Sequence, residues 1–142
     1  MFSKDILIGV LLSLAKPEIH ISRNNRAEIG YAVRLRVNIR GQIEFLRAVE
    51  HALAQQGIDC LVKEKEHKGR PHPILRISGI KNLYKTTMLL PGNYPDAKGE
   101  WNGFKMCVDI FGEGRHRTLE GLELIMAIKG IDNGTNKQGN KN

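Results

Sequence analysis

A strict alternation of apolar and polar residues between positions 29 and 40 is the most regular pattern in the chain. Successive side chains of a β-strand point to opposite faces, so a period of two predicts a strand with one buried face. The apolar positions are Ile29, Tyr31, Val33, Leu35, Val37 and Ile39. A shorter alternation around Ile19 and Ile21 precedes this strand, and the polar stretch 23–28 between them has the composition of a turn. The two segments therefore predict a β-hairpin.

The rest of the chain alternates helical and extended patterns. An apolar helix is predicted from Lys4 to Lys16, with Ser3 as its N-cap and Pro17 as the residue that ends it. Further helices are predicted over 42–56, 79–90, 100–111 and 118–129, and the strands of a second hairpin over 59–66 and 72–78. We expect an α+β fold of order α-β-β-α-β-β-α, followed by two short helices, with helices on one face of a four-stranded antiparallel sheet. Residues 1–131 form one domain, and the polar tail 132–142 is expected to be disordered.

The chain is basic, and its charge is concentrated on the predicted sheet. It has 22 lysines and arginines against 15 aspartates and glutamates, which gives a formal net charge of +7 and favours an anionic partner such as nucleic acid. Arg34, Arg36, Asn38 and Arg40 alternate with the apolar residues of the long strand, so they must project from one face. Like charges so placed repel one another unless an anion lies between them. We therefore expect this face to bind nucleic acid, and a ribbon of antiparallel strands fits the major groove of a DNA duplex.

The second hairpin and the turn of the first extend the same basic surface. The candidate DNA-binding side chains are His20, Ser22, Arg23, Arg26, Arg34, Arg36, Asn38, Arg40, Lys63, Lys65, His67, Lys68, Arg70, His72 and Arg76. The histidines show no metal-ligand spacing, and Cys60 and Cys107 match no metal motif, so no metal site is predicted from them. The low aromatic content of 6% argues against base stacking as the main mode of binding.

The first predicted helix is apolar almost all round. The apolar run 6–14 is shorter than the ~20 residues needed to cross a bilayer, and no small-residue cleavage site follows it, so we expect no membrane association. The protein is expected to be cytoplasmic, or organellar if it is encoded in an organelle. Gly9 and Ser13 lie four residues apart and permit the close approach of another helix. A second copy is the expected partner, with an interface formed by Gly9, Leu12, Ser13 and Lys16.

Four stretches give the chain a resemblance to a known family. They are 5–12, which opens like a motif helix with Gly9 at its contact glycine, and 19–23, 75–83 and 116–122. In this order and spacing they resemble the single-motif LAGLIDADG homing endonucleases. The resemblance implies an α-β-β-α-β-β-α fold and a homodimer of packed motif helices. It also implies that an acidic residue at the end of each helix binds the divalent metal ions that cleave DNA.

That acidic residue is missing from this sequence. Counted forward from Gly9 its position falls on Leu14, and counted back from Ile19 it falls on Lys16. Leucine cannot coordinate Mg²⁺, and lysine would repel it. Glu18 is the only acidic residue nearby, and Lys98 is a weak match to a lysine that the family often keeps near its active site. Mg²⁺ is therefore expected as a cofactor only if nuclease activity survives.

Three hypotheses follow from the sequence. The first is a cleavage-deficient homodimer that binds a specific duplex DNA site. The second is an active, intron-associated homing endonuclease that uses Glu18 or another acidic residue. The third is an RNA-binding intron maturase, which a basic sheet also permits.

Overall fold

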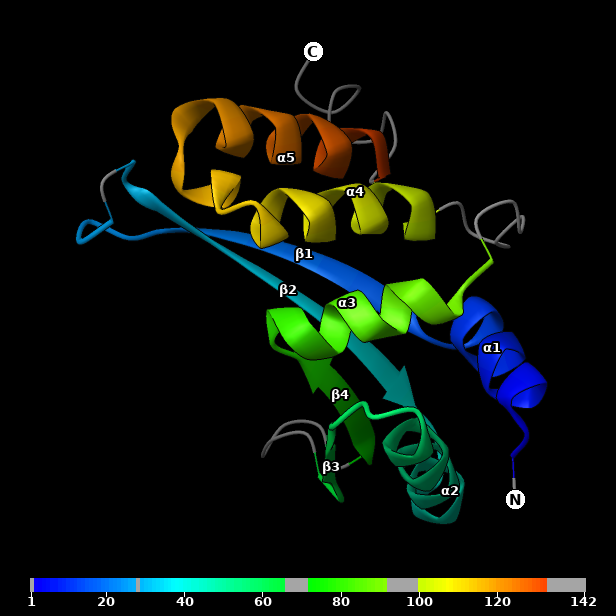
Figure 1. Cartoon of the computed structure of the whole chain (residues 1–142). Coiled ribbons are helices and arrows are strands. Elements are labelled where there is room, and N and C mark those ends of the chain that lie inside the picture. Colours follow the sequence, from blue (N-terminus) through cyan, green and yellow to red (C-terminus); the bar gives the residue numbers. More distant parts are fainter. Residues whose placement is uncertain (1, 28, 66–71, 92–99, 133–142) are drawn as a thin grey trace.

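The computed structural model describes residues 2–27, 29–65, 72–91 and 100–132, and of residues 131 and 132 it describes the backbone only. His67, Lys68, Arg70, Lys98 and all but the first residue of the predicted disordered tail 132–142 therefore lie outside the described residues, and that first residue, Asp132, ends a helix. The elements are α1 (Lys4–Ser13), β1 (Lys16–Arg23), β2 (Tyr31–Arg40), α2 (Ile43–Gln55), β3 (Leu61–Lys63), β4 (Ile74–Ser78), α3 (Ile80–Leu89), α4 (Glu100–Gly112), the 3-10 turn η1 (Arg115–Arg117) and α5 (Leu119–Asp132). The predicted order of helices and strands is confirmed, and Figure 1 shows the arrangement.

The four strands form one antiparallel sheet in the order β1-β2-β4-β3, so the two hairpins lie side by side with β2 and β4 in the middle. Alternate residues of β2, among them Val33, Leu35, Val37 and Ile39, are buried against the helices. α4 packs on β1 and α5 packs on α4, while α2 and α3 contact β4 (Figure 1). The α+β class and the helix-covered sheet face are therefore as predicted.

The first helix ends three residues earlier than predicted. Ser13 is its last residue and Leu14 its C-cap, and both Leu14 and Ala15 donate their backbone N–H to Val10 O. Ala15 is buried at 3% exposure, so the chain turns there into the core instead of continuing the helix. Pro17 lies inside β1, which tolerates it because β1 is an edge strand. Lys16 consequently begins a strand and is not part of the helix.

The second hairpin is shorter than its sequence pattern predicts. β3 covers only Leu61–Lys63, and β4 begins at Ile74 instead of residue 72. Asp59 donates its backbone N–H to Asn82 Oδ1 at the start of α3 and not to a neighbouring strand. Lys65, which the predicted strand over 59–66 includes, lies beyond the end of β3.

Within the described residues, no helix is both long and apolar enough to cross a membrane.

Replacing Gly121 by alanine is expected to destabilise the fold. A Cβ at Gly121 would overlap the carbonyl oxygen of Arg115. Thr118 Oγ1 donates a hydrogen bond to that oxygen and accepts one from the Gly121 backbone N–H, so η1 is held close against α5. Overpacking of this kind costs about 1–3 kcal/mol of unfolding free energy, measurable by urea denaturation. Gly130→Ala on the same helix is the matched control. A Cβ there meets nothing within 4 Å, so the higher helix propensity of alanine should stabilise the protein. Equal effects of the two substitutions would contradict the prediction.

Candidate nucleic-acid interface

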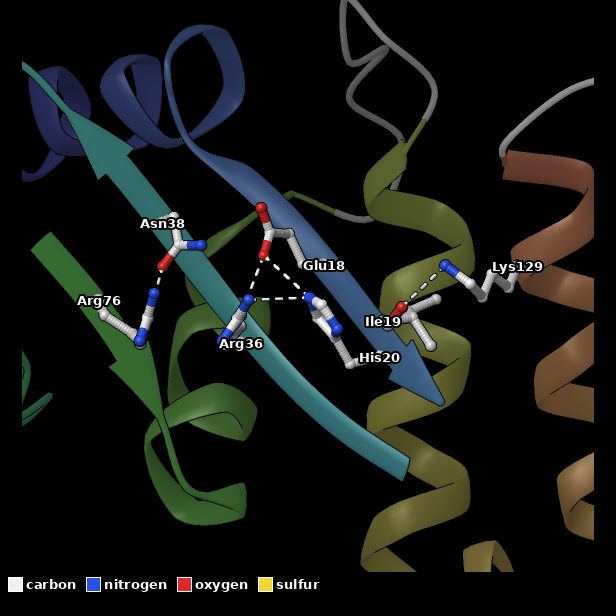
Figure 2. A network of polar contacts seen from close by, with 7 residues as sticks. All are labelled: Glu18, Ile19, His20, Arg36, Asn38, Arg76 and Lys129. Atoms are coloured by element: carbon white, nitrogen blue, oxygen red, sulfur yellow. Dashed lines mark hydrogen bonds and ion pairs between the residues drawn. The ribbon is translucent and has the colours of Figure 1, made fainter. Parts of the chain in front are cut away.

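The sheet face opposite the helices carries polar side chains whose neighbours are fixed by the strand register. Glu18 on β1 is paired with Arg36 on β2, and Asn38 on β2 is paired with Arg76 on β4. Figure 2 shows that these four side chains lie together at the centre of the sheet. We call the group formed by Glu18, His20, Arg36, Asn38 and Arg76 the central polar cluster.

Glu18 and Arg36 form an ion pair within the central polar cluster. Arg36 Nε donates to Glu18 Oε1 at 2.9 Å, and the two side chains are 28% and 19% exposed. His20 Nε2 lies 2.8 Å from Arg36 Nη2 and 3.6 Å from Glu18 Oε1. The acidic residue that the sequence offered as a metal ligand is therefore engaged by an arginine of the predicted DNA-binding face.

Asn38 differs from its predicted role as an exposed DNA contact. It is 2% exposed, and its Oδ1 accepts a hydrogen bond from Arg76 Nε at 2.9 Å. Its Nδ2 is buried, points toward Glu18 in Figure 2 and has no hydrogen-bond partner among the described residues. Asn38 is therefore the buried partner of Arg76 and does not lie on the free surface.

The environment of Glu18 keeps its carboxyl group ionised. Partial burial alone would raise the pKa of this carboxyl. The hydrogen bond from Arg36, a weaker contribution from the nearby Asn38 amide and the positive charges of Arg36 and His20 outweigh burial, so the pKa lies below its ordinary value. Glu18 is thus an anion at neutral pH.

Glu18→Gln is expected to flatten the acid side of the stability profile. Because folding lowers the pKa of Glu18, its carboxylate stabilises the fold fully above the unfolded value near 4.5, and this stabilisation is lost as the pH falls through the lowered pKa. In urea unfolding measured from neutral to acid pH, the free energy of unfolding should fall less steeply for Glu18→Gln than for the wild type. Arg36→Ala should flatten the profile in the same way, because it removes the hydrogen-bond donor and the charge. An unchanged profile in either variant would contradict this account.

The end of α1 does not provide the ligands of a divalent metal ion. Leu14 stands at the C-cap with 53% of its surface exposed, Lys16 begins β1, and Glu18 is paired with Arg36. In the described ranges of the chain, no three His, Cys, Asp or Glu side chains are grouped so that they could hold a metal. A cavity of about 210 Å³ beside β1 is lined by Lys16, Pro17, Glu18, Ile19, His20, Glu100, Phe104 and Lys129. Its mixture of acidic and basic groups does not fit a hard cation.

The exposed side of α1 carries small and apolar residues. Gly9 and Ser13 are exposed, Ile6 on the same face is 51% exposed, and a Cβ at Gly9 would meet nothing within 4 Å. Ser13 Oγ donates to Gly9 O, so this hydroxyl is turned back onto its own helix. Leu12 departs from the predicted interface, because it is 9% exposed and packs in the core.

The other predicted DNA-binding residues are found on exposed positions. Ser22 and Arg23 end β1, Arg26 lies in the turn whose geometry Asn24 fixes by accepting from the Arg26 backbone, and Lys65 and His72 flank the second hairpin. The remaining exposed members are Arg34, Arg40 and Lys63.

Two contacts that the sequence did not reveal shape the edge of this interface. Lys129 on α5 donates its Nζ to Ile19 O on edge strand β1 at 3.0 Å, as Figure 2 shows. Trp101 on α4 donates its indole N–H to Leu11 O, near the end of α1, at 3.1 Å. Both join residues about 90 or more positions apart, so no local pattern could have indicated them. Trp101 secures the end of α1, and Lys129 occupies a backbone acceptor that could pair with another strand.

No protein-family model and no curated protein sequence matches the chain. Solved structures match its fold. The homing endonuclease I-TnaI superposes with a TM-score of 0.75 at 22% sequence identity, over 89% of this chain and 85% of that one. I-SmaMI, bound to uncleaved DNA target in the presence of calcium ions, gives a TM-score of 0.78 at 16% identity over 91% of this chain. The LAGLIDADG meganuclease I-CpaMI, bound to uncleaved DNA, superposes with a TM-score of 0.75 at 20% sequence identity over 91% of this chain.

The chain spans 44% of I-SmaMI and 43% of I-CpaMI, but most of I-TnaI. The fold is therefore that of the LAGLIDADG homing endonucleases, and the resemblance seen in the sequence is confirmed at the level of the fold.

Proposed function

We propose that this protein binds duplex DNA through the outer face of its sheet. The observation that carries the proposal is the concentration of arginines on that face, where Arg34, Arg36 and Arg40 project from one strand and Arg76 from the next. The helices cover the other face, so a ribbon of antiparallel strands is left free to enter a major groove. Two of the structures with this fold, I-SmaMI and I-CpaMI, are bound to DNA, which supports the same partner for this chain.

The proposed complex is a homodimer paired through α1. Its exposed face, with Gly9 and Ser13, allows two helix backbones to approach closely, and pairing would cover the exposed side chain of Ile6. A two-fold dimer would bind a pseudo-palindromic site with one half for each copy. Light scattering at micromolar protein concentration measures the oligomeric state, and a monomeric mass at that concentration would refute the proposed dimer.

Binding is expected to be strongly salt-dependent, and Arg34→Ala should reduce that dependence. Each phosphate contact contributes a slope of about −0.9 to the plot of log affinity against log salt, because neutralising it releases a counterion. Loss of Arg34 should therefore reduce the magnitude of this negative slope by about one unit per chain. Fluorescence anisotropy with duplex DNA at several salt concentrations measures the slope. Lys81→Ala removes one exposed charge from α3 and should leave the slope unchanged. Salt-insensitive binding would refute the proposed interface.

We further propose that the protein binds DNA without cleaving it. At the end of α1 the sequence offers Leu14 where a metal-binding carboxylate would be needed, and Glu18 is held by Arg36. The alternative of an active nuclease predicts double-strand cuts with Mg²⁺ or Mn²⁺ that are lost in Glu18→Gln. The alternative of an RNA-binding maturase predicts that structured RNA competes better than duplex DNA of equal length.

A further inference from the structure

The two arginines at the centre of the outer sheet face are each held through Nε, and Arg36 Nη2 also lies 2.8 Å from His20 Nε2. Arg36 donates through Nε to Glu18, directly opposite on β1, and Arg76 donates through Nε to Asn38, directly opposite on β2. Both hydrogen bonds are 2.9 Å long. An arginine tied through Nε keeps its two terminal nitrogens in a defined plane, and these are the nitrogens that form its hydrogen-bonding fork.

The anchoring residues are themselves fixed. Glu18 is 19% exposed and ionised, and Asn38 is 2% exposed with its unpartnered Nδ2 pointing toward Glu18 (Figure 2). The two anchored pairs, Arg76–Asn38 and Arg36–Glu18, therefore lie next to each other across three strands. An exposed arginine loses much side-chain entropy on binding, whereas these two have lost it already in the folded protein.

We propose that Glu18 and Asn38 are positioning residues that hold Arg36 and Arg76 to read two guanines. This inference rests on the proposed DNA binding. Arginine donates a bidentate pair of hydrogen bonds to guanine O6 and N7, and this contact requires a fixed plane. Phosphates form the walls of the groove, whereas Arg36 and Arg76 project from the two central strands of the sheet, so their position favours base reading over phosphate binding.

The sheet register also sets the spacing of the two guanines. Asn38 is the direct partner of Arg76, and Arg36 lies two residues before Asn38 on β2, so the two arginines are diagonal neighbours. Diagonal positions on adjacent strands are about 7–8 Å apart. Successive base pairs are about 3.4 Å apart along the helix axis, so the two guanines should lie about two base steps apart.

Selection from a fully randomised duplex DNA library, using the full chain, tests the inference. Sites enriched by the wild type should contain two guanines about two steps apart. Arg36→Lys and Arg76→Lys should each abolish one guanine preference and leave the other, with a loss of discrimination of roughly tenfold or more at that position. These variants keep the charge, so the total affinity for unselected DNA should change little.

The positioning role of Glu18 predicts two opposite changes. Glu18→Ala should bind unselected DNA more tightly, because one negative charge is removed, and yet lose the guanine preference that belongs to Arg36. Glu18→Gln keeps an oxygen that can accept from Arg36 Nε and should retain most of the preference. Glu123→Ala on α5 makes the same change in charge and should leave the preference intact. A purely structural role for Glu18 would lower the affinity for all sequences equally and would not change the preference at one base.

The possible failures can be told apart. If the wild type enriches no sequence and binds no duplex, the proposed DNA binding is wrong. If it enriches sites that lack the guanine pair, or if Glu18→Ala selects the same bases as the wild type, DNA binding stands and the positioning role is overturned. If Arg36→Lys weakens binding to all DNA sequences equally, Arg36 contacts phosphate and the proposed reading of guanine by Arg36 also fails.

Discussion

Replacing Leu14 by aspartate is expected to give a protein that cuts its DNA sites when Mg²⁺ is added, whereas the wild-type chain leaves the same sites intact. Leu14 is the C-cap of α1 and its side chain is 53% exposed, so a carboxylate there removes nothing from the core. The C-terminal end of a helix is electronegative, which disfavours an isolated aspartate by about 0.3–1 kcal/mol and favours a bound cation. Hard oxygen ligands paired across the proposed dimer would then provide the metal ligands that Leu14 cannot supply at the end of α1.

The measurement uses a supercoiled plasmid that carries a site enriched by the wild-type protein. Nicked or linear plasmid should accumulate with Leu14→Asp and Mg²⁺, and not with EDTA. Leu14→Asn is the matched control, since it has nearly the same shape without the charge. Cutting by the wild type itself would contradict the proposed loss of activity, and its disappearance in Glu18→Gln would then support the active-nuclease alternative. A Leu14→Asp protein that binds the site but never cuts would show that the end of α1 is not the missing metal position.

Much of the fold was predictable because one segment carries an unambiguous signal. The alternation that ends at Ile39 determines both the strand and the face that it buries, since a shift by one residue would expose every apolar side chain. The same alternation places Arg34, Arg36 and Arg40 together without any knowledge of the fold. Ends of elements were less predictable, because they depend on distant contacts. α1 stops at Ser13 when Ala15 enters the core, and β3 is shortened where Asp59 bonds to Asn82 on α3.

The candidate site was predictable in composition but not in its internal contacts. Sequence periodicity assigns Asn38 to the polar face, yet the residue is buried because Arg76 from another hairpin lies across it. Glu18 was chosen as the nearest acidic residue to the end of α1, and only the register of β1 against β2 shows that Arg36 engages it. Cross-strand register depends on the length and geometry of the turn, which begins with Asn24 accepting from the Arg26 backbone.

Gly9→Leu is expected to convert the proposed dimer into a monomer and to remove high-affinity binding to a site with two halves. In the monomer an added side chain at Gly9 meets open space, so the substitution should not harm the fold, and the gain in helix propensity favours it. In a two-fold helix pair the leucine enters the interface from both copies, and each costs about 1–3 kcal/mol of overpacking. The dimer dissociation constant should therefore rise at least about tenfold.

Sedimentation or light scattering measures the change in mass, and anisotropy compares a half site with a full site. Gly130→Leu is the matched control, because Gly130 is also an exposed helical glycine with nothing within 4 Å of an added Cβ. Gly130→Leu should remain dimeric and bind the full site like the wild type. The two binding measurements separate the roles of α1 and the sheet, since Gly9→Leu should still bind a half site with wild-type affinity. If Gly9→Leu stayed dimeric, the pairing face would have to lie elsewhere, while the arginine-rich sheet face would keep its proposed role.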